Sequence, residues 1–390
     1  MLRSMYSGIS GLRTHQTKLD VVGNNIANVN TTGFKSSTVQ FQDTLSQLTQ
    51  AAAGPQAEAG GMNPAQIGLG VKVQGVTLNF VQGAGQTTGR GTDLMINGNG
   101  FFAVSRGGET LYTRAGAFDL DADGRLVTPD GALLTGWPAV DGVVQQGGQL
   151  APIRLDTATT SPAIATTRAA ASGNLPDGAA VGTQLVRDVQ AYNATGTART
   201  LAVTFTRTAA GWDVAGDDGA STGSASVAFT DGRPSGGATT LTVGGVAVDL
   251  SALTGYAGPA TVTVGGANGN AAGTLDAFAV GPDGIVMGSF SNGARQAVGR
   301  VALVTFANPA GLEKAGGSAY RATANTGEPV IGAAGEGQAG TLSAGMLEMS
   351  NVDLSQEFVD LITAQRGFQA NSRVITTSDE VLGELVQLKR

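Results

Sequence analysis

Hydrophobic side chains recur every seven residues at both ends of the chain, where polar side chains fill the intervening positions. Because an α-helix has 3.6 residues per turn, residues seven apart lie on one helical face, which predicts helices over residues 1–28 and 353–390. The N-terminal stripe consists of Met5, Leu12, Leu19 and Ile26, flanked by Ile9 and Val22. The C-terminal stripe consists of Leu361, Phe368, Ile375 and Leu382, widened by Phe358, Ile362, Leu385 and Val386.

The ends of the C-terminal segment carry helix-terminal signals. Asp353 with Gln356 three residues later predicts an N-terminal cap, and Lys389 and Arg390 suit the negative end of the helix dipole. The N-terminal segment contains three glycines, each of which weakens a helix by roughly 1 kcal/mol relative to alanine. Both stripes could pack on a domain core as ordinary amphipathic helices. Since no other segment has a helical period, we favour pairing of the two termini as a coiled coil.

The residues between the two helices follow the pattern of β-structure. Runs such as residues 201–206 and 246–250 alternate apolar and polar side chains, as half-buried strands do. Dipeptides that supply the positive φ angles of tight hairpin turns separate these runs. They are Asp-Gly at 123–124, 130–131, 141–142, 177–178, 218–219, 231–232 and 283–284, and Asn-Gly at 97–98, 99–100, 268–269 and 292–293. The middle of the chain is therefore predicted to form antiparallel sheets in sandwiches or barrels.

The composition of this β region changes along the chain and predicts nested domains. Residues 151–275 are rich in Ala, Thr and Gly, whereas residues 72–150 and 276–344 carry larger apolar side chains. We interpret the two flanks as one β domain and residues 151–275 as a second β domain inserted into it. Residues 29–71 and 345–352 are then connectors to the terminal helices. The fold class is mainly β with α-helical termini.

Composition and charge exclude several functional classes. The 390 residues include 60 glycines, 14% charged residues and no cysteine, and the net charge is −7. Without a basic run the chain has nothing to neutralise phosphates, so we expect no nucleic-acid partner. The N-terminus lacks an apolar secretory core and an A-x-A cleavage site, and no stretch of about 18 apolar residues predicts a membrane span.

Candidate catalytic and cofactor-binding residues are scarce. His15 is the single histidine, it lies off the apolar stripe, and we expect it to be a solvated surface residue. With no cysteine and one histidine, Cys/His zinc sites and Ser-His-Asp triads have little support. The glycine-rich segment 83–89 misses the dinucleotide-binding spacing by one residue. We therefore predict no enzyme activity, no resident metal and no cofactor.

One acidic loop resembles a calcium-binding loop. Residues 119–124 read Asp-Leu-Asp-Ala-Asp-Gly, and Asp130 falls at the position of the final ligand. However, that position is normally glutamate, and the neighbouring apolar residues alternate as in strands. Asp123-Gly124 is also a hairpin turn signal, so we favour a plain β-turn over a calcium site.

Five segments carry a resemblance to a known family. They are residues 19–35 (LDVVGNNIANVNTTGFK), 93–104 (DLMINGNGFFAV), 113–118 (TRAGAF), 345–354 (GMLEMSNVDL) and 364–372 (AQRGFQANS). Together they resemble the axial proteins of the bacterial flagellum, which comprise rod, hook and hook-associated proteins. The resemblance covers about residues 1–145 and 280–390. The positions that carry it at the two ends are Asn24, Asn25, Ala27, Asn28, Thr32, Gly33, Phe34, Lys35, Asn351, Asp353, Gln365, Arg366 and Asn371.

The resemblance implies a structural function in motility. A member of the hook type would leave the cell through the flagellar type III export apparatus and polymerise beneath a hook cap on the rod. It would bend as a universal joint between motor and filament, and hook-filament junction proteins would follow it. The terminal helices would line the inner tube through the stripe residues, and the β domains would face outward from this extracellular assembly.

Length and the inserted β region favour a hook-type member, because rod proteins resemble much shorter chains. A rod protein with an enlarged insert is the nearest alternative. A secreted β-rich adhesin or carbohydrate-binding module is the alternative from a different functional class. It would need a cluster of exposed aromatic residues, yet the chain has only two tryptophans, Trp137 and Trp212.

Overall fold

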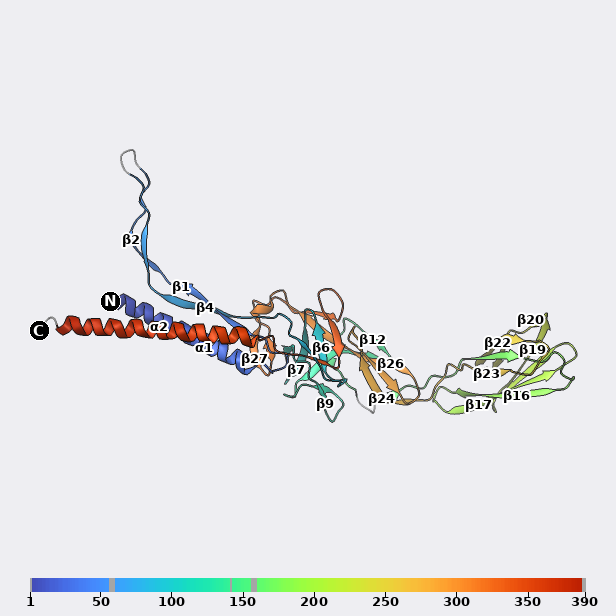
Figure 1. Ribbon diagram of the computed structural model, residues 1–390. Coiled ribbons are helices and arrows are strands. Elements are labelled where there is room, and N and C mark those ends of the chain that lie inside the picture. The colour runs from blue at the N-terminus through green and yellow to red at the C-terminus, as the bar shows by residue number, and fades with distance from the viewer. Residues whose placement is uncertain (1, 56–59, 141, 156–159, 388–390) are drawn as a thin grey trace.

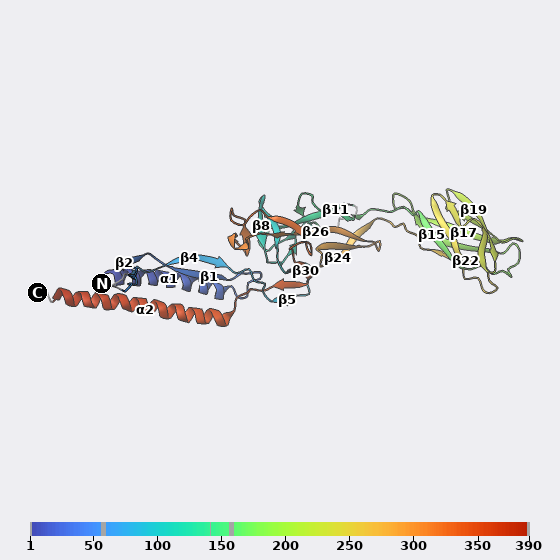
Figure 2. The ribbon, with the colours of Figure 1, turned by 90° about the horizontal axis from the view of Figure 1, so that it is seen from above.

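The computed structural model describes residues 2–55, 60–140, 142–155 and 160–387. The molecule is elongated and consists of three parts in a row (Figures 1 and 2). A pair of helices with an adjoining β-ribbon forms one end, a β region lies in the centre, and a second β region forms the other end. Two stretches of chain connect the central and distal β regions, so the distal region is inserted into the central one.

The two helices at the chain ends lie side by side and run antiparallel. They are α1 Leu2–Ala27 and α2 Leu354–Gln387, and both chain ends lie at the same end of the molecule (Figure 1). Asp353 caps α2, because its Oδ1 accepts the backbone N–H of Ser355 at 2.9 Å and of Gln356 at 3.3 Å. The Gln356 amide turns toward Asp360 instead of the cap. The predicted helices and their pairing are confirmed; Lys389 and Arg390 lie outside the described residues.

A two-part β-ribbon follows α1, mostly within residues 29–71, which we expected to be a connector, and its last strand enters residues 72–150, which we expected to be β structure. Strand β1 Ser37–Asp43 pairs with β4 Val71–Leu78, and β2 Ser46–Gln50 pairs with β3 Ala65–Gly68. The first pair lies along α1, while the second pair extends away from the helices as an arm (Figure 1). Strand β4 alternates apolar and polar side chains, with Val71 and Val73 on one face, whereas β2 is mainly polar and fully exposed.

The central β region joins strands from both flanks of the insert. The main sheet has the order β14-β24-β25-β26-β11-β7-β8-β28-β27. Its strands are β7 Phe101–Arg106, β8 Glu109–Thr113, β11 Leu133–Val140, β14 Thr160–Ser161, β24 Gly273–Val280, β25 Ile285–Phe290, β26 Arg295–Thr305, β27 Glu313–Gly316 and β28 Ala319–Arg321. Short strands attach to it: β9 Asp119–Leu120, β10 Leu126–Val127, β12 Val143–Val144, β13 Ala151–Pro152 and β29 Val330–Ala333. Two further pairs join the flanks: β6 Leu94–Asn97 with β30 Thr341–Ala344, and β5 Gly85–Thr87 with β31 Met346–Glu348.

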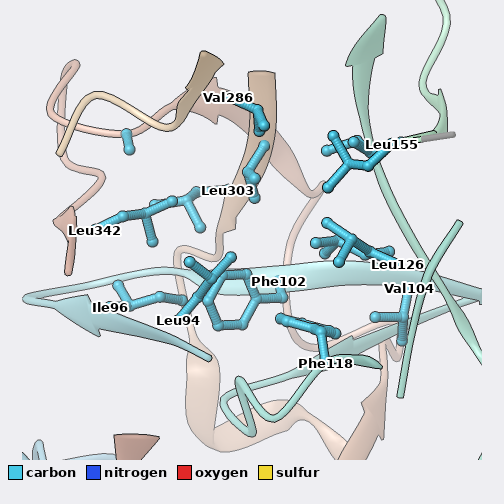
Figure 3. Packing of buried hydrophobic residues seen from close by; sticks show 14 of the residues in the cluster. Leu94, Ile96, Phe102, Val104, Phe118, Leu126, Leu155, Val286, Leu303 and Leu342 are labelled. Carbon is cyan, nitrogen blue, oxygen red and sulfur yellow. The ribbon is translucent and has the colours of Figure 1, made fainter. Parts of the chain in front are cut away.

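Large apolar side chains from distant parts of the chain fill the central core. Leu94, Phe102, Phe118 and Leu303 point toward one another in Figure 3. The rings of Phe102 and Phe118 meet edge to face at 5.3 Å between centroids. A short 3-10 helix, Pro309–Gly311, follows β26. Burial of these side chains on both sides of the insertion point ties the two flanks into one core.

The distal β region is a sandwich of two sheets around its own core. One sheet has the order β21-β22-β15-β23 and the other runs β16-β17-β18-β19-β20. Phe205 and Trp212 from the second sheet pack with Val248 from the first. The strands are β15 Arg168–Asn174, β16 Gln184–Tyr192, β17 Ala198–Arg207, β18 Trp212–Asp217, β19 Thr222–Thr230, β20 Arg233–Gly237, β21 Thr240–Val243, β22 Val246–Thr254 and β23 Thr263–Gly265.

One strand pair in the sandwich departs from the antiparallel expectation. Strands β15 and β22 pair in parallel, because the chain crosses to the five-stranded sheet after β15 and returns to the four-stranded sheet only before β21. Parallel neighbours need such a long crossover. The turn prediction succeeds at Asp231-Gly232, where φ values of 54° and 75° close the two-residue hairpin between β19 and β20. Gly178 and Gly269 are the two predicted turn glycines without positive φ.

Candidate assembly surface and the joint that orients it

Small and polar side chains line the seam between α1 and α2. A Cβ on Gly11 would lie 2.6 Å from the Asn371 side chain, and a Cβ on Gly367 would lie 2.4 Å from the His15 ring. Glycine therefore lets the two backbones approach closely at these positions. Predicting the pairing was correct, but the apolar stripes form only part of the paired face. The reason is that close approach favours residues without bulky side chains.

Polar contacts fix the register across the seam. Lys18 Nζ lies 2.8 Å from Asp360 Oδ1, and Asn25 Nδ2 donates to Glu357 Oε1 at 2.9 Å. The hydrogen bond from Lys18 holds the pKa of Asp360 below its ordinary value. Burial raises the pKa of Glu357, and the bond from Asn25 partly opposes that rise. These contacts specify one antiparallel alignment of the helices.

His15 is part of this seam, which corrects the expectation of a solvated histidine. It is partly buried, and its ring meets Phe41 of β1 edge-on at 5.6 Å between centroids. Burial lowers its pKa, and the nearby positive charge of Lys18 lowers it further. The sequence pattern placed His15 off the apolar stripe. It did not reveal that β1 and α2 would cover this polar side of α1.

Part of the apolar stripe of α2 faces solvent. Phe358 is 50% exposed and Ile362 is 53% exposed, whereas Val22 of α1 is only 4% exposed. Phe368 and Val386 are also exposed, and the side chain of Leu385 lies outside the described residues. The remaining stripe residues are intermediate in burial: Met5, Ile9, Leu12, Leu19, Ile26, Leu361, Ile375 and Leu382. Fully covering one large exposed side chain is worth roughly 1.5–3 kcal/mol, so this face favours association.

Two asparagines tie the helices to the start of the β-ribbon. Asn25 accepts the Ser37 N–H at 3.0 Å and donates to the Ser37 carbonyl at 2.8 Å. Asn351, just before α2, accepts the Ser36 N–H at 2.8 Å and donates to the Val81 carbonyl at 3.0 Å. A side-chain amide suits this role because it donates and accepts at once. Both helices are thereby held at adjacent backbone positions.

A fully buried carboxylate joins four segments next to these asparagines. Glu348 Oε1 lies 2.5 Å from Lys35 Nζ and accepts the Gly83 N–H at 2.9 Å. Its Oε2 lies 3.4 Å from an Arg114 guanidinium nitrogen. The side chains of Lys35 and Glu348 are both 0% exposed. We call Lys35, Arg114 and Glu348 the joint cluster, because it links the segment after α1, the central β region and the strand that leads into α2.

The joint cluster is costly to disrupt. Burial lowers the pKa of Lys35 even though Glu348 supports its charge, and burial likewise lowers the pKa of Arg114. Removing one member of a buried ion pair leaves an uncompensated charge in a medium of low polarity. The sequence singled out Lys35 but missed its partners. Arg114 and Glu348 lie within recognisable segments, yet nothing local shows that they meet Lys35.

The other residues singled out from the sequence divide between the joint and the helices. Gly33 has φ of 66° and donates its N–H to the Glu348 carbonyl at 2.7 Å. A Cβ at that position would lie 2.4 Å from the Ala115 nitrogen, so glycine is required there. Phe34 is buried beneath Lys314, whose Nζ lies 4.9 Å from the ring centroid. Asn24, Asn28 and Thr32 border a groove at the joint, and Ala27, Gln365 and Arg366 are exposed.

The acidic loop that resembles a calcium site is a hairpin turn between β9 and β10. Asp121 accepts the backbone N–H groups of Asp123 at 3.0 Å and Arg125 at 2.7 Å. Arg125 forms ion pairs with both aspartates, and Arg106 pairs with Asp130. Within the described ranges no three His, Cys, Asp or Glu side chains group as a metal site. None of the helices in those ranges combines the length and apolarity needed for a bilayer crossing.

Comparisons with known proteins match both ends and the first β segment. Three family models match: "Flagella basal body rod protein" over residues 5–35, "Flagellar hook protein FlgE/F/G D1 domain" over 95–167, and "Flagellar basal body rod FlgEFG protein C-terminal" over 343–388. The chain is 36% identical to the flagellar hook protein FlgE of Treponema pallidum, over 100% of both chains. It is 34% identical to the flagellar basal-body rod protein FlgG of Bacillus subtilis, also over 100% of both chains. Among solved structures, flagellar hook protein FlgE2 of Helicobacter pylori is similar with a TM-score of 0.48 and 13% identity, covering 68% of this chain and 100% of that one.

Proposed function

This chain belongs to the family of bacterial flagellar hook and rod proteins, and we propose that it is the structural subunit of the flagellar hook. The helix pair carries an apolar face that its own molecule leaves partly exposed, with Phe358 and Ile362 about half accessible. This observation supports self-assembly most directly, because neighbouring copies can cover that face. Full-length identity of 36% with a hook protein supports the hook among the members of the family. The role is structural and not catalytic.

Assembly through the helices accounts for the order of the three parts. The helix pair lies at one end and the two β regions follow in line (Figure 2). With the helices forming an inner tube through the stripe residues, the β regions extend outward from it. The joint cluster then sets the direction in which the β regions leave the tube.

The location and partners follow from the same proposal. The subunit is exported by the flagellar type III apparatus and assembles outside the cell. Its partners are further copies of itself, the rod, the hook cap and the hook-filament junction proteins, and the tube acts as a universal joint. The absence of cysteine supports this route, because no disulfide has to form or break during export.

A rod subunit is the second candidate, supported by the 34% identity with a rod protein over the whole chain. Electron microscopy of cells that lack the protein separates the two candidates. For a hook subunit, the basal bodies should retain a rod but carry no curved hook and no filament, and the restored gene should return curved tubes. Basal bodies that end before the distal rod would assign the chain to the rod, and intact hooks would refute both candidates.

A further inference from the structure

A groove of about 450 Å³ opens at the joint between the helices and the central β region. One wall is the loop after α1 with Asn28 and Thr32, and the other is the hairpin of β27 and β28 with Lys314. Phe34 and Leu111 contribute an apolar floor. Figure 1 shows β27 beside the end of α1 and the start of α2, far from the C-terminal end of α2.

Lys314 is the cation that this groove offers to a partner. Its Nζ donates to Ser37 Oγ at 3.0 Å and lies over the Phe34 ring, but within the described residues it forms no ion pair. The side chain is accessible, and partial desolvation of the ammonium lowers its pKa. The other charges of the groove, Arg106 and Asp130, neutralise each other at 2.8 Å. An incoming carboxylate would therefore meet one uncompensated positive charge beside an apolar floor.

The C-terminal end of α2 carries a negative charge and an exposed apolar side chain. Asn25 faces Glu357 and Gly11 faces Asn371, so α1 begins opposite about residue 380 of α2. The last two turns of α2 thus extend beyond α1 and have no helix to pack against. Val386 in this segment is 70% exposed, and within the part of the chain that the structure describes Glu384 forms no ion pair.

We propose that the last two turns of α2 in one copy dock into the groove of the next copy, with Glu384 facing Lys314. The inference rests on the proposed function as a self-assembling subunit. Glu384 lies 30 residues beyond Leu354, about 45 Å along a helix with 1.5 Å rise per residue, so it cannot reach the groove of its own chain. Two different patches at opposite ends of the helix pair make a heterologous contact. Such a contact generates an open helical polymer when the rotation between successive copies does not close a ring.

The occupant is a second copy because the end of α2 and the groove are complementary in charge and both carry an apolar side chain beside that charge. Glu384 and Val386 bring a carboxylate and an apolar side chain to one short helical segment. Lys314 and Phe34 bring an ammonium and an apolar ring to one groove. The helix length then sets an axial spacing of about 45 Å between successive copies.

Disulfide trapping tests the contact, and because the native chain has no cysteine, only the introduced cysteines can form a bridge. In the double variant Lys314→Cys/Glu384→Cys, oxidation of assembled tubes should produce a ladder of dimers, trimers and longer chains on a non-reducing gel. An intramolecular bridge cannot form across about 45 Å. The matched control is Lys314→Cys/Asp188→Cys, since Asp188 is exposed on the distal sandwich, and each single-cysteine variant is a further control. Tubes that give no ladder, or no more than the controls, would overturn the proposal.

Charge reversal provides an independent readout. Lys314→Glu should reduce polymer yield at least tenfold, and Lys314→Glu/Glu384→Lys should recover most of that yield. Unchanged assembly of Lys314→Glu would overturn the docking and leave the proposed function standing. Failure of the wild-type chain to form tubes would overturn the proposed function and the docking together. If Lys314→Glu does not fold, the disulfide ladder alone decides.

Discussion

Replacing Glu348 by glutamine tests whether the joint cluster holds the central β region to the helices. The amide keeps the shape of the side chain but removes the negative charge that faces Lys35 and Arg114. The amide oxygen can still accept the hydrogen bond from the Gly83 N–H, whose nitrogen lies 2.9 Å from Glu348 Oε1 in the native chain. The perturbation is therefore the loss of charge compensation for two buried cations.

The magnitude follows from the burial of the cluster. Lys35 and Glu348 are 0% exposed and Arg114 is 3% exposed. Removing one partner of such a buried pair costs 3–5 kcal/mol in comparable proteins, and the retained bond to Gly83 places Glu348→Gln near the lower limit, at about 3 kcal/mol. With a urea m-value of about 3 kcal/mol per molar for a region of this size, the unfolding midpoint should fall by about 1 M.

The two tryptophans report on the two β regions separately. Trp137 is buried in the central region and Trp212 in the distal sandwich. In a Trp212→Phe background, Glu348→Gln should lower the urea midpoint of Trp137 fluorescence by about 1 M. In a Trp137→Phe background, the midpoint of Trp212 fluorescence should stay unchanged. An unchanged Trp137 midpoint, or an equal shift of both, would refute the assignment of the cluster to the joint.

Two controls separate charge loss from general damage. Glu109→Gln breaks the ion pair with Arg321, in which both side chains are about half exposed, and should leave the Trp137 midpoint unchanged. Lys35→Met/Arg114→Met/Glu348→Leu removes all three charges of the joint cluster. It should be more stable than Glu348→Gln alone, because no buried charge remains uncompensated. The triple variant should nevertheless assemble into tubes of altered curvature, seen by electron microscopy.

Four further predictions concern the helices and the insert. Leu361→Asp should block polymerisation, measured by sedimentation, while the thermal unfolding of the β regions stays unchanged, because this stripe residue serves contacts between copies. Gly11→Leu should separate the helices, because its Cβ would lie 2.6 Å from the Asn371 side chain. Gly23→Leu, with open space around it, should leave the helices paired. Cross-linking of α1 to α2 measures the pairing in both variants. Replacing residues 162–272 by a short Gly/Ser linker should preserve the unfolding midpoint of the central region, since Ser161 pairs directly with Gly273. The depressed pKa of Asp360 means that its carboxylate supports helix pairing above its ordinary pKa of about 3.9, and this support is lost as pH falls through the lowered value. Asp360→Asn should remove that loss, measured as helical circular dichroism between pH 5 and 2.

Local patterns in the sequence were sufficient for the helices and for most of the β structure. The seven-residue repeats predict α1 and α2, because side chains on one helical face follow directly from 3.6 residues per turn. Asp231-Gly232 predicts a hairpin turn, since both residues take the positive φ that a two-residue turn requires. The arm of β2 and β3 escaped prediction because its strands are exposed on both faces and need no apolar alternation.

By itself the sequence determined the helices, the turns and the β character of the middle, because each depends on residues a few positions apart. Only the tertiary structure decided which helix faces meet and which charges pair. Lys35 and Glu348 are 313 residues apart, and nothing near either one identifies the other. Their pairing becomes favourable only after the chain has folded around them, since burial strengthens the attraction between opposite charges and makes an unpaired one costly.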